Sequence, residues 1–531
     1  MRKLPIYLLL FISFIEGGSV MIVELLGAKI IAPYYGTSLY VWSSVLGVTL
    51  GALALGYFFG GQISRKYTGE NSLFIVLLFG GFLTVIAPLI APKILLITDP
   101  LGVIMGSLLS VTLYLLAPIS CLGSVSPIII QLINKNQAEA GKSAGTVYAI
   151  STVGGILATF LAGFYLIPTI GIYITAFTTG GILCAIALLY FIFSKNNLLL
   201  LTMVFLTLIA IVLIPSRKLY DNTRVVYHST GILGEWTVVD FGQWKVEGNN
   251  KIYRKLLLNG IDQTNTQLGY EPLSLWDYPH KIAAYASMKP CGSKALLLGM
   301  GGGSIAHELL AMDLDLDIVE LDKRINYIVK NYFNYNAEES NLYIDDARHF
   351  IRTTSERYDV VVIDLAIGEV QPAHIFSLEG LEDLKRIINN DALVIINFQG
   401  NIYSPAYSMG PRSIYRTLLK AGFNVKYYSP DNPHIGEISL VEDIYFLASL
   451  KNYDYKSMME DLRYNAWFKY NDFYYEDLIT DKSLDLSNAY VLVDDKPKLD
   501  LINSASILQW RQNKIQEHIQ KMVKDGVHIY N

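Results

Sequence analysis

The chain has 531 residues, more than one ordinary domain holds, and a net charge of −5, which gives no basic footprint for nucleic acid. Hydrophobic residues make up 52% of the sequence, and the mean hydropathy is +0.35. All eight histidines and most of the charged residues lie after about residue 215. We therefore expect an integral membrane domain over residues 1–215, followed by a soluble part.

Long apolar stretches before residue 215 predict seven transmembrane helices, since each has the roughly 20 residues that a span needs. Pro118 and Pro127 interrupt one stretch, which is alternatively two short spans or a broken helix, so the count is seven or eight. Glu16, Glu24 and Lys29 in the first span are interpreted as interhelical ion pairing rather than a substrate or proton path. The stretches are 5–31, 40–63, 73–96, 101–133, 145–168, 170–193 and 197–214.

The secondary-structure pattern predicted for the soluble part changes near residue 290. Alternating, β-branched stretches within 223–262 predict a small antiparallel sheet, and we assign a small β-strand domain to residues 216–290. From residue 294, strands at 294–299, 316–320, 341–344, 358–363, 391–397, 423–428 and 442–448 alternate with helices at 304–312, 323–335, 346–354, 377–389 and 409–421. Such alternation predicts a doubly wound, mostly parallel Rossmann sheet over residues 291–450, and a helical extension over 451–531.

The segment 296–304 reads as a strand that runs into a glycine turn and then a helix. Gly299, Gly301 and Gly303 would let the backbone approach a nucleotide-like ligand closely, although a three-glycine turn also occurs as plain loop. Glu320 ends the next strand at the spacing of about 20 residues typical of a carboxylate that accepts ribose hydroxyls.

Two more acids follow the third and fourth strands of this series. Asp346 is placed to accept from an adenine amino group, whereas for Asp345 we favour a helix cap or a solvated face. Asp364 puts a carboxylate at the rim above the sheet. Acids at successive strand ends are hard to explain as caps alone, so together they predict an adenosine-type ligand.

Several motifs match one known family. They are Lys255 to Gln263, Tyr270-Glu271, Leu297 to Glu308, and Pro372-Ala373 with Phe376. Residues 250–450 resemble the spermidine synthase family of polyamine aminopropyltransferases, which has the S-adenosylmethionine-dependent methyltransferase-like fold. The resemblance implies that Gln263 binds substrate and that Asp364 is the catalytic aspartate. It also implies that Glu320 binds ribose, that Asp346 and Ala347 bind adenine, and, more weakly, that Tyr270 and Pro372 contact substrate.

The membrane half resembles the variant of this family that is fused to a multi-pass membrane domain. Glu24, residues 145–155 and Val493 to Pro497 match that variant's pattern. Two family acids that hold amines are absent, because Gly302 and Ile367 occupy their positions. A buried ammonium without a partner is costly, so this departure bears on the substrate. Glu369 or Asp277 is a candidate substitute.

Three hypotheses remain open. In the first, Asp364 is the general base of aminopropyl transfer from decarboxylated S-adenosylmethionine to a polyamine such as putrescine, which releases methylthioadenosine. In the second, intact S-adenosylmethionine reacts, either as a lyase substrate that gives methylthioadenosine and a lactone or as a methyl donor. In the third, the protein is a polyamine transporter or sensor.

The partners implied are a small polyamine, the lipid bilayer and, from the family resemblance, a second copy in a homodimer. No metal is expected, since the three cysteines lie far apart and the chemistry needs none. The positive-inside rule with seven spans places the soluble part outside the cell, whereas use of a cytosolic nucleotide places it inside. We expect a multi-pass cell-membrane protein with a cytoplasmic soluble part.

Overall fold

The fold is described from a computed structural model. It covers residues 4–36, 39–67, 69–134, 139–194, 223–231, 233–246, 249–269, 273–335, 339–366, 370–429, 441–460, 478–480 and 482–514. The chain divides into two compact units. The first contains the N-terminal helices with His228–Trp236, and the second contains most of the residues from Thr237 onward. The four domain boundaries given above stay a prediction.

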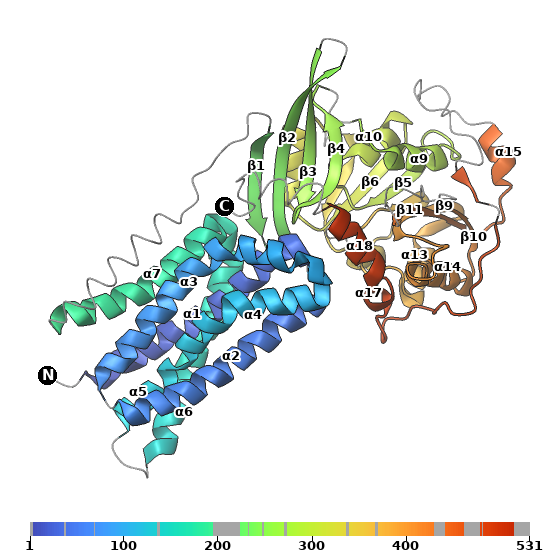
Figure 1. Ribbon diagram of the computed structural model, residues 1–531. Helices are drawn as coiled ribbons and strands as arrows, with labels where there is room; N and C mark the ends of the chain where they lie inside the picture. The colour runs from blue at the N-terminus through green and yellow to red at the C-terminus, as the bar shows by residue number, and fades with distance from the viewer. Residues whose placement is uncertain are drawn as a thin grey trace. The chain divides into compact units, whose positions relative to one another are not determined.

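The N-terminal unit is a bundle of long apolar helices (Figure 1). Its helices are α1 (Ile6–Tyr35), α2 (Leu39–Lys66), α3 (Glu70–Thr98), α4 (Gly102–Gly123), α5 (Val125–Ile133), α6 (Ala140–Leu161) and α7 (Ile167–Phe193). By length and composition, the described residues contain five helices able to cross a membrane. The last runs from Ala140 to Phe193, where Gly171 has non-helical backbone angles, and it contains two of the predicted stretches.

The other span predictions have different outcomes. Helices α4 and α5 meet at Ser124 and belong to a single candidate, Ile104–Ile133, rather than two spans. The stretch 197–214 lies outside the described residues. Glu16 accepts hydrogen bonds from the hydroxyls of Ser126 (3.2 Å) and Ser151 (3.3 Å). Glu16 is therefore hydrogen-bonded by hydroxyl groups, and ion pairing between Glu24 and Lys29 stays a prediction.

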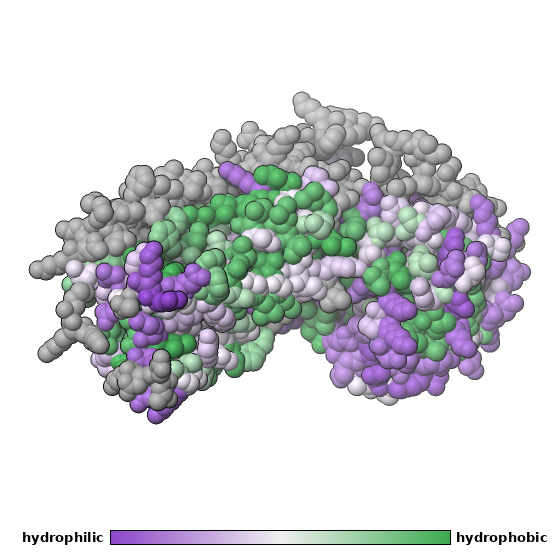
Figure 2. Space-filling view, turned by 60° about the horizontal axis from the view of Figure 1, so that its bottom comes forward, coloured by the Kyte–Doolittle hydropathy of each residue, from purple (hydrophilic) through white to green (hydrophobic). Residues whose placement is uncertain are grey.

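The surface of these helices is apolar. Green atoms spread over the helical unit in Figure 2, whereas purple atoms gather on the α/β unit. Large exposed hydrophobic side chains include Leu50, Phe58, Phe79, Leu113, Phe160 and Phe193. A contiguous apolar surface of this kind suits contact with lipid or with another apolar surface.

Two sheets build the second part of the chain. The four-stranded sheet has the order β1-β2-β3-β4, with β1 (Thr223–Gly231), β2 (Gly234–Val246), β3 (Asn249–Leu258) and β4 (Ile261–Gln267). Strands β3 and β4 are antiparallel. A helix that sequence patterns did not predict, α9 (Asp277–Ala286), follows.

The seven-stranded sheet has the order β10-β11-β9-β8-β5-β6-β7. Its strands are β5 (Lys294–Leu298), β6 (Asp315–Glu320), β7 (Asn341–Ile344), β8 (Tyr358–Ile363), β9 (Ile388–Gly400), β10 (Asn424–Tyr428) and β11 (Glu442–Ser449). Strands β5 to β9 pair in parallel, whereas β11 pairs antiparallel with β9 and β10. The order reverses at β5, which places the ligand crevice above the carboxyl ends of β5 and β8.

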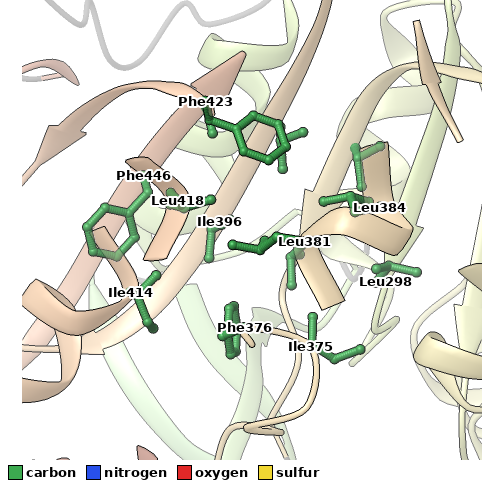
Figure 3. Packing of buried hydrophobic residues seen from close by; sticks show 14 of the residues in the cluster. Leu298, Ile375, Phe376, Leu381, Leu384, Ile396, Ile414, Leu418, Phe423 and Phe446 are labelled. Carbon is green, nitrogen blue, oxygen red and sulfur yellow. The ribbon is translucent and has the colours of Figure 1, made fainter. Parts of the chain in front are cut away.

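Helices cover the sheet. They are α10 (Ser304–Ala311), α11 (Arg324–Tyr332), α12 (Ala347–Thr353), α13 (Leu378–Arg386) and α14 (Met409–Lys420), followed by α15 (Tyr455–Glu460), α17 (Leu499–Ile502) and α18 (Ser504–Lys514). On one face, side chains of α13, α14, β9 and β11 point toward one another, among them Leu381, Leu418, Ile396 and Phe446 (Figure 3). Burial of this core fixes the register of β9, because a shift by one residue would turn Ile396 out of it.

Candidate active site

The glycine turn after β5 is shaped by its neighbours. Gly299, Gly301 and Gly303 have φ values of +91°, +53° and +86°, which L side chains rarely adopt. A Cβ atom at Gly299 would lie 2.2 Å from the backbone oxygen of Asp364. The turn therefore passes directly beside the end of β8, and helix α10 begins immediately after it at Ser304.

Glu320, at the end of β6, faces the turn. Its carboxylate accepts from the backbone N–H groups of Met300 (3.1 Å) and Asp322 (2.8 Å). Burial raises the pKa of the Glu320 carboxyl, although the hydrogen bonds from these N–H groups oppose the rise. The residue is therefore held at the place where a ribose-binding acid is expected.

Changing Glu320 to Gln should weaken binding of methylthioadenosine about tenfold, because a charged acceptor of hydroxyl groups is lost. Isothermal titration calorimetry measures this directly. The matched control is Asp315→Asn, an exposed acid at the opposite end of the same strand. Equal weakening in both variants, or none in Glu320→Gln, would show that Glu320 does not bind the nucleoside.

Asp346, rather than Asp345, caps the helix that follows β7. The N-cap of α12 is Asp346, whose Oδ1 accepts from the N–H groups of Arg348 (2.9 Å) and His349 (3.0 Å). Asp345 instead accepts from the N–H of Asp346 and lies 2.6 Å from His349 Nδ1. Asp345 therefore does not cap the helix, and its partly exposed side chain fits the other expectation, a solvated face. The second oxygen of Asp346 lies 3.6 Å from His374 Nε2 on a half-exposed side chain, so it is open to a ligand.

Asp364 is held at the carboxyl end of β8. Its Oδ1 accepts from Asn397 Nδ2 (3.0 Å) at the end of β9, and it also accepts from the Tyr278 hydroxyl on α9. Burial raises the pKa of Asp364 to about 6, while the hydrogen bonds from Asn397 and Tyr278 lower it less. Such a carboxylate is ionised at neutral pH and is still basic enough to take a proton.

The pKa of Asp364 predicts a pH dependence of turnover. A base must be deprotonated to act, so kcat/KM should rise with pH to a limb near pH 6 and level off above it. Steady-state rates between pH 5 and 8 measure this limb, and Glu320→Gln serves as the control because it should leave the limb in place. A profile that falls as pH rises through 6 would contradict the role of Asp364 as a base.

Strand β4 reaches the glycine turn from the other sheet. The Thr264 hydroxyl accepts from the N–H of Gly302 (2.8 Å), and the Gln263 backbone oxygen lies near Gly301. A Cβ atom at Gly302 would lie 2.4 Å from Thr264 Oγ1. Thr264 thus occupies the space that a side chain at Gly302 would need, which gives a structural reason for the missing family acid.

The remaining predicted residues have different outcomes. Tyr270 and Glu369 lie outside the described residues. Asp277 is exposed in the first turn of α9, and Pro372 accepts from the N–H of Ile375 (3.1 Å). Neither is placed against Asp364 by a described hydrogen bond.

Three residues of the site were missed from the sequence: Tyr278, Asn397 and Thr264. Asn397 could have been identified from the sequence, since it is the last residue of a predicted parallel strand. Thr264 and Tyr278 had none, because long-range packing brings them to the site. His280, which lies 3.1 Å from Glu308 Oε1 through Nδ1, ties α9 to α10 and so positions Tyr278.

The glycine turn after β5 and the carboxylates of Glu320 and Asp364 thus lie together at the carboxyl ends of β5, β6 and β8, the edge at which such sheets bind nucleosides. Residues 278–430 match the family described as "Spermine/spermidine synthase domain". The chain therefore contains a domain of that family, and the relatives named polyamine aminopropyltransferase are transferases.

Two relatives and one solved structure illustrate the similarity. Polyamine aminopropyltransferase 2 of Aquifex aeolicus is 22% identical over 85% of this chain and 90% of its own. N-terminal histidine N-methyltransferase of Emericella nidulans is 31% identical over 24% of each chain. A probable spermidine synthase of Corynebacterium glutamicum has a TM-score of 0.35 and 16% identity, over 45% of this chain and 82% of its own. Several other aminopropyltransferases are matched over less than half of their length.

Among the described residues, no group of three or more His, Cys, Asp and Glu side chains is arranged to hold a metal ion.

Proposed function

We propose that the protein is a membrane-anchored aminopropyltransferase that transfers the aminopropyl group of decarboxylated S-adenosylmethionine to a polyamine such as putrescine. The observation that carries this proposal is the partly buried Asp364, held by Asn397 and Tyr278 beside the glycine turn and Glu320. The match of residues 278–430 and the Aquifex relative, which is similar over most of the chain, support it.

In this reaction Asp364 takes a proton from the acceptor amine. The amine nitrogen attacks the carbon next to the sulfonium, a C–N bond forms and the C–S bond breaks with its electron pair going to sulfur. The products are the extended polyamine and neutral methylthioadenosine. Because the sulfonium is a good leaving group, the protein needs only to position the substrates and to accept a proton. Glu320 and Asp346 would bind the nucleoside.

The test is product analysis by mass spectrometry after incubation of the purified protein with decarboxylated S-adenosylmethionine. Methylthioadenosine together with spermidine, formed only when putrescine is present, is the expected result. Methylthioadenosine formed equally without amine would contradict amine transfer.

A second candidate is a reaction of intact S-adenosylmethionine. It is favoured by the absence of an acid at Gly302, where Thr264 fills the space, and by the methyltransferase of Emericella among the relatives. The nucleoside product separates the possibilities: methyl transfer gives S-adenosylhomocysteine, whereas a lyase gives methylthioadenosine without any acceptor.

We further propose that the apolar helices span the cell membrane, that the α/β part is cytoplasmic and that the protein forms a homodimer. The apolar surface of the helical unit supports the first of these. Protease protection in oriented membrane vesicles and the mass of the detergent-solubilised protein test the other two.

A further inference from the structure

The edge of the sheet beside Asp364 carries polar side chains from two further strands. Because β11 runs antiparallel to β9, the first residues of β11 lie at the edge where the parallel strands end. Asp443, the second residue of β11, pairs directly with Gln399 of β9, and Tyr445 pairs with Asn397. Asp443 therefore lies at the same edge of the sheet as Asp364, although β11 runs in the opposite direction.

These four side chains share one face of the sheet. Ile396 and Phe398 of β9 enter the core under α13 and α14, so Asn397 and Gln399, which alternate with them, point to the other face. Direct cross-strand partners lie on the same face, which places Asp443 and Tyr445 there too.

Helix α9 covers this face. The ring of Tyr445 lies 5.7 Å from that of Tyr285 on α9, and Tyr278 of the same helix donates to Asp364. Asp364 and Asp443 both act electrostatically on Tyr278 and raise its pKa, so the two carboxylates lie around one phenol group. The face is therefore continuous with the site of Asp364.

Amide oxygens on this face have no donor among the described residues. The Asn397 side chain is 5% exposed, and its Nδ2 donates to Asp364 while its Oδ1 has no partner. Gln399 Oε1 and Gln371 Oε1 are likewise buried without a donor among the described groups, and Gln371 Nε2 donates to the Asn397 backbone oxygen. Buried acceptors are costly when unpaired, so a ligand with several N–H donors fits this place.

We propose that Asp443, together with Asn397 and Gln399, binds the second, non-reacting ammonium group of a diamine acceptor. This inference rests on the proposed function and names its acceptor class. Asp364 and Asp443 are separated by two strand spacings, roughly 10 Å, across the sheet and by two residues, roughly 7 Å, along it, so they lie about 12 Å apart. A short diamine hydrogen-bonded at both ends spans such a distance.

The test compares putrescine with n-butylamine, which has the same carbon chain but only one amino group. Asp443→Asn should raise the KM for putrescine about tenfold, leave kcat nearly unchanged and leave the KM for n-butylamine unaltered. Asp315→Asn, at the opposite edge of the sheet, is the control and should change neither constant. Unchanged kinetics with putrescine, or an equal loss for both amines, would overturn the inference.

A binding measurement separates this inference from the proposed function. If the wild-type protein transfers no aminopropyl group to either amine, the proposed function fails, but putrescine binding can still be titrated by calorimetry. Binding about tenfold weaker in Asp443→Asn than in wild type supports the diamine subsite even then. Equal binding in the two proteins, with equal melting temperatures, would overturn it.

Discussion

Asp364→Asn is expected to reduce kcat by about 10²–10⁴-fold, while methylthioadenosine binding stays within about twofold of wild type. The amide keeps the size of the carboxylate and, through its Oδ1, the hydrogen bond from Asn397 Nδ2, but it cannot accept a proton. Single-turnover product formation and calorimetry together measure the two quantities. In a protein that only senses or transports its ligand, Asp364→Asn would leave ligand binding unchanged, and there would be no turnover to lose.

The fold of this variant can be checked independently. Burial raises the pKa of Asp364 from 3.8 to about 6, so the folded state binds more protons than the unfolded state between these values. The stability contributed by this group is therefore present at low pH and falls as pH rises through about 6. Asp364→Asn should raise the free energy of unfolding at pH 7.5 by about 1–3 kcal/mol and change it little at pH 4.

The control for Asp364→Asn is Asp313→Asn, an exposed acid whose φ of +59° asparagine tolerates. It should leave kcat unchanged. Loss of turnover in both variants, or full turnover in Asp364→Asn, would remove Asp364 from the mechanism.

Gly299→Ala is expected to abolish both nucleoside binding and turnover. The added Cβ meets the backbone oxygen of Asp364 at 2.2 Å, a distance that requires β8 or the turn to move. The φ of +91° adds backbone strain of about 1–2 kcal/mol. A shift of the Asp364 backbone misplaces the base, so the effect on turnover should exceed 10²-fold. Calorimetry and single-turnover rates measure these losses.

Gly292→Ala separates strain from steric clash. Gly292 also has a positive φ, +76°, but a Cβ atom there would meet no atom within 4 Å. It should lower the melting temperature modestly and leave binding and kcat intact. If Gly292→Ala damaged the site as strongly as Gly299→Ala, the close approach of the turn to β8 would not be the cause.

Much of the α/β fold could be predicted from the sequence because its strands are short, apolar and bounded by turn residues. The predicted strand 358–363 coincides with β8, and the predicted helix 409–421 differs from α14 by one residue. Helix α9 was missed because it follows the small sheet without a strong apolar pattern. Strand β9 was predicted too short, since its first residues include Asn389, Asn390 and Asp391, which weaken the strand pattern.

The site was predictable where residues follow strands along the chain. Glu320 and Asp364 lie where the strand ends placed them. Thr264 contacts Gly302 from a different sheet, and Asp443 lies on an antiparallel strand. No local sequence pattern could therefore predict that either residue lies at the site. Asp346 rather than Asp345 caps α12 because this helix begins one residue later than predicted.

The proposed function depends on transfer of a three-carbon amine to an acceptor. The direct measurement uses decarboxylated S-adenosylmethionine with ¹³C in its aminopropyl group and follows the label by mass spectrometry in the presence of putrescine. Aminopropyl transfer predicts labelled spermidine in a one-to-one ratio with methylthioadenosine, and neither product with Asp364→Asn. Methylthioadenosine without labelled spermidine, or a methylated acceptor made only from intact S-adenosylmethionine, would contradict it.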